Sequence, residues 1–496
     1  MWPAGGIAAA AVGAVVLRVP FLHVGLSPDE GGYAYVARMW AQGARLYGPS
    51  AWVDRPQGLL LAYRLLLSIA DGPWGIRLGA VVFGAAITVL VGAIGWMLKG
   101  PWTGAAAAVI YAVVGVGPHV QGFTFNGELA AALPATAAIA AALAWRRSGA
   151  TLWLAVAGLS AGTALLMKQS GFDGLLVAGA VVCTGSTRSR RSVGVFVTAA
   201  LTPLAVSALH GLMVGWSDYW FAVVGYKLSA PSGADSSLAG RLGPLASSWV
   251  GARRDLELIV LAALAGVGFT LLRRPRLWLP AGWLLAAFAG FNAASLYWPH
   301  YYVQLLPPLA LLIAVGATTL PGRVLAPAAI LLVVGPALLK LDALEDMSLG
   351  AKRAVIPYYG QYVRDERVAR AVDRRTRPGE SIYALDSEPD LYFLADRPAD
   401  FPYLWAHPLE EIPGAVTRLR ALLAGPDRPA LVVVFRPPRL VDRTGGLSRI
   451  SCCRQAQSCL NFSTAHAHPA SNTPLFPGQE MACIRLTSGV RAARMS

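Results

Sequence analysis

The chain has 496 residues, of which 55% are hydrophobic and 14% are charged, and its formal net charge is +15. Soluble globular proteins carry about 25% charged residues, so this composition excludes an ordinary soluble enzyme and indicates several membrane-spanning helices. Much of the excess of Lys and Arg lies in short clusters between apolar runs. Such clusters set the orientation of spans, so we expect no nucleic-acid partner.

About eleven apolar segments follow one another, each near the length that a bilayer-spanning helix needs. They cover residues 3–22, 76–98, 102–118, 128–145, 151–167, 172–186, 193–213, 255–272, 277–296, 301–317 and 325–341. If the spans alternate, basic residues mark the connections on one side, at Lys99, Arg146, Arg188, Arg273 and Arg323. By the positive-inside rule this side is cytoplasmic. The loop 23–75 and the chain after Leu341 are therefore predicted to lie outside the plasma membrane.

The long outer loop contains two segments with helical periodicity and an apolar face, residues 31–44 and 57–70. Each carries an arginine, Arg38 in the first and Arg64 in the second. We therefore predict interfacial helices on the outer leaflet rather than further spans.

After Leu341 charged residues become frequent, and helix-like and strand-like segments alternate. Helices are predicted at 361–375, 389–395 and 409–423, and strands at 381–385 and 430–435. This alternation predicts a small extracytoplasmic α/β domain. The expected division is thus a transmembrane catalytic domain at 1–341, the α/β domain at 342–445, and an irregular tail at 446–496.

The tail is rich in Ser, Ala, Cys and His and shows no usable period. Its composition fits disorder, and a frame error in the sequence is the alternative. Four of the five cysteines lie there, and the adjacent pair Cys452-Cys453 has neither zinc-binding nor redox spacing. The cysteines therefore predict no metal site.

Two adjacent carboxylates, Asp29 and Glu30, follow the first span at the start of the first interfacial helix. Helix capping is one explanation, because Ser27 and Asp29 can cap and acids favour a helix N-terminus. A carboxylate in a partly desolvated cleft also suits a general base that activates a hydroxyl group. Its neighbour would then orient the acceptor or hold a cation, so both interpretations stay open.

Further polar residues lie at the outer ends of spans or just before the second interfacial helix. They are Asp54, Arg55, Glu128, Lys168, Gln169, His300 and Tyr301. An ionisable group at a span end is a functional candidate, with capping as the alternative for Glu128. Arg55, Lys168 and His300 suit a lipid phosphate at headgroup level, and Lys168 could instead pair with one of the carboxylates. Anchoring is the alternative for Arg55, snorkelling for Lys168, and a metal-ligand role for His300.

Short motifs occur in a fixed order along residues 1–400. They are Asp29-Glu30 followed by Tyr33-Ala34-Tyr35-Val36-Ala37-Arg38, Asp54-Arg55-Pro56, Gly75-Ile76-Arg77-Leu78, Asn126-Gly127-Glu128, Leu166-Met167-Lys168-Gln169, His300-Tyr301-Tyr302, Leu306-Pro307-Pro308, Ser381-Ile382-Tyr383 and Pro389 to Arg397. This ordered set resembles the GT-C-fold glycosyltransferases of family 39, the branch with protein O-mannosyltransferases and the aminoarabinose transferases of lipid A. Many relatives have Lys-Pro-Pro after the Asp of the second motif, where this chain has Arg55-Pro56-Gln57.

The resemblance implies an inverting transfer on the outer face of the membrane, from a polyprenyl-phosphate sugar to a hydroxyl of a protein, lipid or glycan. Asp29 would be the general base, with Glu30 in support. The expected donor-phosphate residues are Asp54, Arg55, Arg77, Lys168, Gln169, His300 and Tyr301, and the expected acceptor or supporting residues are Tyr33 and Glu128. Some members of the family use a divalent cation and others do not, so the cofactor stays open.

A carrier or flippase is the alternative function. Transporter sites usually lie near the bilayer midplane on broken helices. The middle of each predicted span is nearly free of charge here, which favours the enzyme.

Overall fold

The computed structural model describes residues 2–185, 189–229, 237–273, 278–293, 296–320, 325–342, 352–353, 355–385, 388–435, 460–462 and 481–485. The chain forms two compact units. The first comprises Met1–Gly25, Arg55–Tyr219 and Pro231–Gly360, and the second comprises Leu26–Asp54, Trp220–Ala230 and Gln361–Ser496. The second unit thus joins the first outer loop, up to Asp54, to most of the predicted α/β domain.

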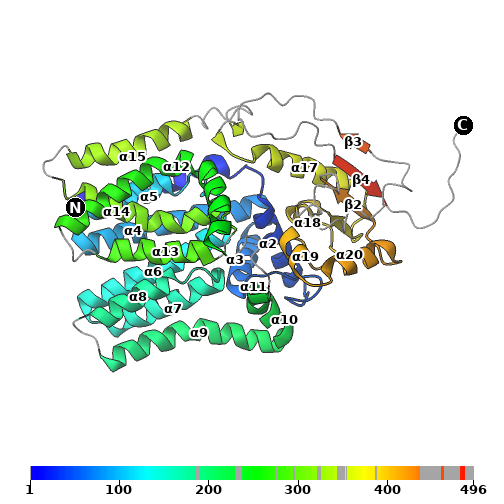
Figure 1. The fold of residues 1–496 in the computed structure, drawn as a ribbon, viewed down its shortest axis with the longest axis horizontal. Coiled ribbons are helices and arrows are strands. Elements are labelled where there is room, and N and C mark those ends of the chain that lie inside the picture. The colour runs from blue at the N-terminus through cyan, green and yellow to red at the C-terminus, as the bar shows by residue number, and fades with distance from the viewer. Residues whose placement is uncertain are drawn as a thin grey trace, which may run out of the picture. The chain divides into compact units, whose positions relative to one another are not determined.

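The first unit is a bundle of mostly apolar helices (Figure 1). In chain order they are α1 (Trp2–Val16), η1 (Val19–Phe21), α3 (Gln57–Ile69), α4 (Pro73–Lys99), α5 (Pro101–Val114), α6 (Gly127–Ser148), α7 (Thr151–Met167), α8 (Asp173–Thr184), α9 (Arg190–Val214), α10 (Trp216–Trp220), α12 (Leu238–Arg273), α13 (Trp278–Ala293), η3 (Pro299–Leu305), α14 (Leu306–Ala317) and α15 (Leu325–Asp342). Each predicted span overlaps one of these helices, so the multi-span helical prediction is confirmed.

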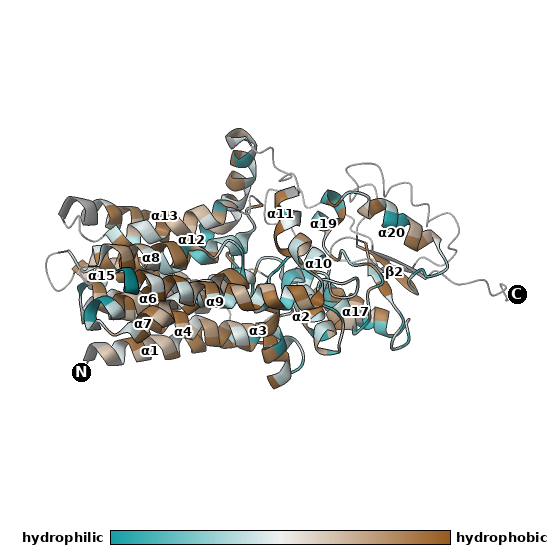
Figure 2. Ribbon diagram, turned by 90° about the horizontal axis from the view of Figure 1, so that it is seen from below, coloured by the Kyte–Doolittle hydropathy of each residue, from teal (hydrophilic) through white to brown (hydrophobic). Residues whose placement is uncertain are grey.

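Five stretches of helix in the described part of the chain are long and apolar enough to cross a membrane. They are Ala4–Phe21, Pro73–Lys99, Gly127–Ser148, Arg190–Val214 and Pro299–Ala317, and shorter apolar helices accompany them. The helices of the first unit are coloured mainly as hydrophobic in Figure 2, whereas α17 and α20 of the second unit carry more hydrophilic residues.

Local sequence separates neighbouring helices in the bundle. Gly100, at φ +117°, ends α4, and Pro101 begins α5 directly after it. Glycine tolerates this positive φ, and proline is favoured in the first turn because that turn needs no intrahelical N–H donor.

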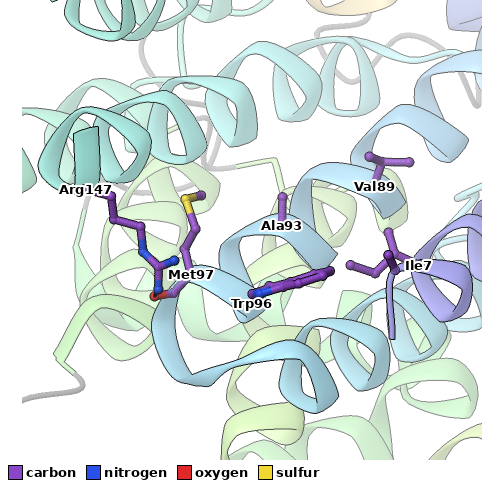
Figure 3. A pocket seen from close by; sticks show the side chains of 7 residues that line it. Ile7, Val89, Ala93, Trp96, Met97 and Arg147 are labelled. Carbon is purple, nitrogen blue, oxygen red and sulfur yellow. Dashed lines mark hydrogen bonds between the residues drawn. The ribbon is translucent and has the colours of Figure 1, made fainter. Parts of the chain in front are cut away.

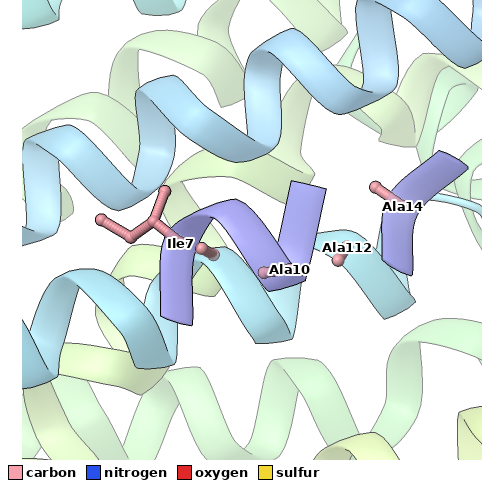
Figure 4. Close-up of a cluster of buried hydrophobic side chains, with 5 residues drawn as sticks. Ile7, Ala10, Ala14 and Ala112 are labelled. Atoms are coloured by element: carbon pink, nitrogen blue, oxygen red, sulfur yellow. The ribbon is translucent and has the colours of Figure 1, made fainter. Parts of the chain in front are cut away.

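Small side chains bring α1 close to α5. Ile7, Ala10 and Ala14 of α1 form a buried cluster with Ala108 and Ala112 of α5 (Figure 4). Such small residues allow close helix approach in a membrane.

Ile7 also lines an apolar pocket of about 450 Å³ (Figure 3). Its other lining residues are Ala4, Val89, Ala93, Trp96, Met97 and Arg147. The guanidinium of Arg147 donates to the backbone oxygen of Met97. Since the lining includes no predicted site residue, this pocket is separate from the candidate site.

The second unit combines short helices with a small sheet. Its elements are α2 (Pro28–Ala41), η2 (Phe221–Gly225), α11 (Tyr226–Ser229), α17 (Tyr359–Asp373), β1 (Ile382–Ala384), α18 (Asp390–Ala395), α19 (Ala406–Glu411), α20 (Ala415–Ala424), β2 (Leu431–Val434), β3 (Leu460–Phe462) and β4 (Met481–Arg485). The strand order is β1-β2-β4-β3. β1 and β2 are parallel, with Ile382 opposite Leu431, and the other two pairs are antiparallel. The α/β character predicted for this part of the chain is thus confirmed.

Two predictions in this unit need correction. The single helix expected at 409–423 is wrong, because α19 ends at Glu411 and α20 begins at Ala415. Pro413 disfavours helical backbone at Ile412, which has ψ 119°, and Gly414 has φ +74°. The predicted irregular tail contributes β3 and β4 to the sheet, and its other residues lie outside the described part.

The two helices predicted in the outer loop both form, as α2 and α3. The middle of α2, from Glu30 to Ala37, is buried, and the helix packs against α18 of the same unit. Its apolar face is therefore covered at least partly by protein, a contact that periodicity alone did not predict.

Candidate functional site

Glu128 lies at the centre of a buried cluster of charges in the first unit. Asn126 caps α6, because its side chain accepts a hydrogen bond from the Leu129 N–H at 2.9 Å, and this places Glu128 in the first turn. Lys168 follows the last residue of α7, and its Nζ forms an ion pair with Glu128 Oε1. The two side chains are only 2% and 6% exposed. A buried ion pair therefore links the ends of α6 and α7.

Three more residues complete the cluster. His300 Nε2 lies 3.9 Å from Glu128 Oε1, and Lys168 Nζ lies 3.8 Å from the centre of the Tyr301 ring. Arg55 also interacts electrostatically with Glu128. The structure thus brings together five of the residues that the sequence analysis singled out, from four separate segments of the chain.

The orientation of His300 depends on a residue that the sequence analysis missed. His300 Nδ1 lies 3.1 Å from Gln121 Oε1, which can accept a hydrogen bond from Nδ1–H. With Nδ1 held in this way, the other ring nitrogen, Nε2, faces Glu128. Gln121 has φ +54°, a strained conformation for a residue other than glycine. Nothing in the sequence around Gln121 signals this contact.

The cluster suits an anionic group. Within the cluster, the two cations Lys168 and Arg55 lie around the one carboxylate of Glu128, and a protonated His300 would be a third. In a buried site, charge–charge interactions are stronger than in water. A phosphate would therefore find both positive charge and hydrogen-bond donors here.

Two other predicted residues of the first unit lie beside or apart from this cluster. Gln169 is half-buried directly after Lys168. Arg77 is buried and donates to the backbone oxygens of Val24, Gly25 and Phe123, at 3.4, 2.5 and 3.2 Å. These contacts account for Arg77 as a structural residue that fixes two loop segments.

In the second unit, the acidic pair divides into two different environments. Glu30 is fully buried, and its Oε2 accepts hydrogen bonds from the N–H and Oγ of Ser27, both at 3.0 Å. Ser27 Oγ in turn accepts from the Glu30 N–H at 3.3 Å. This is a capping box, so capping explains Ser27 and Glu30. Its Ser-x-x-Glu spacing was visible in the sequence and was missed.

Asp29 is half-buried, and its Oδ1 accepts a hydrogen bond from Trp405 Nε1 at 2.9 Å. The ring of Trp405 also lies 5.5 Å from the ring of Tyr33, centre to centre. At Gly32 a β-carbon would lie 2.5 Å from the Trp405 ring, so only glycine permits this approach. The Trp405 contact spans 376 residues, which is why no local pattern predicted it.

Asp54, the remaining predicted residue, forms an ion pair with Lys227 of α11. Lys227 Nζ also lies 5.1 Å from the centre of the Tyr226 ring. Asp54 is thereby held by a cation that the sequence analysis did not single out.

Solved structures with the same architecture identify the fold. Apo ArnT from Cupriavidus metallidurans matches with a TM-score of 0.60 and 16% identity, over 97% of both chains. The same protein bound to undecaprenyl phosphate matches with a TM-score of 0.58 and 15% identity, again over 97% of both chains. The chain has the GT-C fold.

A third GT-C structure extends the comparison. The archaeal oligosaccharyltransferase AglB from Archaeoglobus fulgidus, in complex with an inhibitory peptide and a dolichol-phosphate, matches with a TM-score of 0.51 and 12% identity. The match covers 88% of this chain and 69% of AglB. No protein-family model and no curated protein matches the sequence. The GT-C chain described here is thus a multi-span membrane protein with low sequence identity to these structures.

Proposed function

We propose that this GT-C protein is an inverting glycosyltransferase that moves a sugar from a polyprenyl-phosphate donor to a hydroxyl acceptor on the outer face of the plasma membrane. The observation that carries the proposal is the buried cationic cluster around Glu128. Two proteins with this fold, ArnT and AglB, were solved with polyprenyl phosphates, which supports a donor of that class.

The residues of the cluster would bind the donor phosphate. Lys168, Arg55 and His300 would neutralise the negative charge that develops on the phosphate as the bond to the sugar breaks. Glu128 would hold Lys168 in position and limit the net charge of the free site. Tyr301, whose ring faces the ammonium of Lys168, and Gln169 would complete the donor contacts.

Asp29 would act as the general base. Its carboxylate takes the proton of the acceptor hydroxyl as that oxygen attacks the anomeric carbon and the polyprenyl phosphate leaves with the bonding electrons. This single displacement inverts the configuration of the sugar. Trp405 would orient Asp29 through its hydrogen bond. Glu30 would support Asp29 indirectly, by capping α2, and Tyr33 would complete the acceptor side.

A genetic experiment tests the proposal. The gene is deleted and replaced by wild-type or Asp29→Asn copies, and envelope glycans, lipids and glycoproteins are compared by mass spectrometry. We expect one hexose or pentose to be lost from a defined acceptor in the deletion strain, and to return only with the wild-type copy. Loss of the sugar with accumulation of a lipid-linked sugar on the cytoplasmic side, restored by the Asp29→Asn copy as well as by the wild type, would indicate a flippase instead.

A further inference from the structure

A second group of acidic residues lies in the second unit, apart from the pair Asp29-Glu30. The group consists of Asp365 of α17, Glu388, and Asp390 at the start of α18. Each residue offers a carboxylate oxygen, and these oxygens lie within 4.8 Å of one another. All three residues are buried, with Asp365 and Asp390 fully inaccessible to solvent. Because like charges repel strongly in a buried site, the group needs compensation.

The neighbouring residues compensate only part of it. Arg364 donates from Nε to Asp365 Oδ1 at 2.8 Å and from Nη2 to Glu388 Oε1 at 2.6 Å. Gln361 Nε2 donates to Glu388 Oε2 at 3.0 Å. Among these described residues, one guanidinium thus faces three carboxylates.

Three buried oxygens of this group accept no hydrogen bond from another described residue. They are Asp365 Oδ2 and both carboxylate oxygens of Asp390. A buried carboxylate without donors is costly, and native proteins usually satisfy such groups or bind an ion there. The unpartnered Asp390 side chain therefore points to a ligand rather than to a solvated acidic face.

We propose that Asp365, Glu388 and Asp390 bind one divalent cation, Ca²⁺. Oxygen-only ligands favour hard cations such as Ca²⁺ and Mg²⁺ over zinc. Mg²⁺ usually keeps several water molecules, whereas Ca²⁺ accepts more protein oxygens, so a fully buried set of carboxylates favours Ca²⁺. Oxygens bound at about 2.3–2.6 Å from one Ca²⁺ lie at most about 5 Å apart, which agrees with the observed spacing.

The site also bears on α2. A β-carbon at Gly31 would lie 2.2 Å from the β-carbon of Asp390, so α18 touches the α2 backbone two residues after Asp29. A cation that fixes Asp390 would therefore stabilise the contact between α17, α18 and α2. The inference itself concerns cation binding and stability, and it does not depend on the proposed transfer reaction.

The test uses the full-length protein purified in detergent, stripped with a chelator and dialysed. Thermal unfolding is followed as Ca²⁺ is added, and calorimetry counts the bound ions. At saturating Ca²⁺ we expect the melting temperature of the wild type to rise by about 5 °C. Asp390→Asn and Asp365→Asn should abolish the rise. In chelator Asp390→Asn should be at least as stable as the wild type, because it removes a buried carboxylate that accepts no hydrogen bond from another described residue.

Asp396→Asn is the matched control. Asp396 directly follows α18, is 80% exposed and has φ +50°, which asparagine tolerates. This variant should keep the full Ca²⁺ effect. The proposal is overturned if Ca²⁺ leaves the stripped wild type unchanged, which would mean that protons satisfy the group. It is equally overturned if Asp390→Asn keeps the shift or if Asp396→Asn loses it.

Discussion

Lys168→Met removes the cation that pairs with Glu128, and the structure sets the size of the expected loss. Both side chains are nearly fully buried, so solvent screening weakens the pair little. Breaking such a pair costs about 3–5 kcal/mol, because the other charge remains buried without compensation. His300 lies 3.9 Å from Glu128 Oε1, and in its protonated form would return about 4 kcal/mol at an effective dielectric constant of 20. Without that compensation from His300, we expect a loss of about 3 kcal/mol.

A double-mutant cycle separates this pair from its surroundings. Glu128→Gln alone should also destabilise the protein, and the double variant should lose less than the sum of the single losses, by about 2 kcal/mol. Unfolding free energies come from SDS titration in mixed micelles, followed by tryptophan fluorescence. Lys99→Met is the control, since Lys99 Nζ donates to Val315 O and Thr318 Oγ1, and should cost about 1 kcal/mol. Single losses that add to within about 0.5 kcal/mol would show that Lys168 and Glu128 do not stabilise each other.

Three further outcomes are expected. Gly31→Ala should lower the free energy of unfolding by about 1–3 kcal/mol, because the new β-carbon would overlap Asp390. Gly251→Ala in α12 is the control: its β-carbon would meet open space, so thermal unfolding should show no change or a slight stabilisation. Glu30→Gln should keep both stability and sugar transfer, because glutamine also completes a capping box. Glu30→Ala should lose about 1 kcal/mol of stability. Equal loss of transfer in both variants would mean that the charge of Glu30 itself is needed. A reporter fused after Leu341 should signal outside the membrane, and a cytoplasmic signal would reverse the predicted topology.

The helices could be predicted because their causes are local. Long apolar runs, Pro101 after Gly100 and the basic connections are all visible in the sequence, and each predicted span overlaps an observed helix. The break at Pro413-Gly414 was equally local, but the helical periodicity on either side of it obscured the signal.

The site could be predicted only as a set of span ends. Glu128, Lys168 and His300 were candidates because ionisable groups are rare in a membrane protein's helices, and the fold brings them together. The contacts that Gln121 and Trp405 make with the site residues could not be predicted. Gln121 meets His300 across 179 residues, and Trp405 meets Asp29 across 376. Such contacts depend on tertiary packing, which neither spacing nor periodicity encodes.

Sugar transfer by the Asp29→Asn variant decides whether Asp29 is the general base. The purified protein is given a polyprenyl-phosphate sugar and the acceptor found by mass spectrometry, and release of polyprenyl phosphate is measured together with the glycosylated product. We expect Asp29→Asn to bind the donor and unfold like the wild type, yet to transfer sugar at least about 100-fold more slowly, as for the loss of a general base. Transfer at near wild-type rates by the folded Asp29→Asn protein would show that Asp29 is not the base.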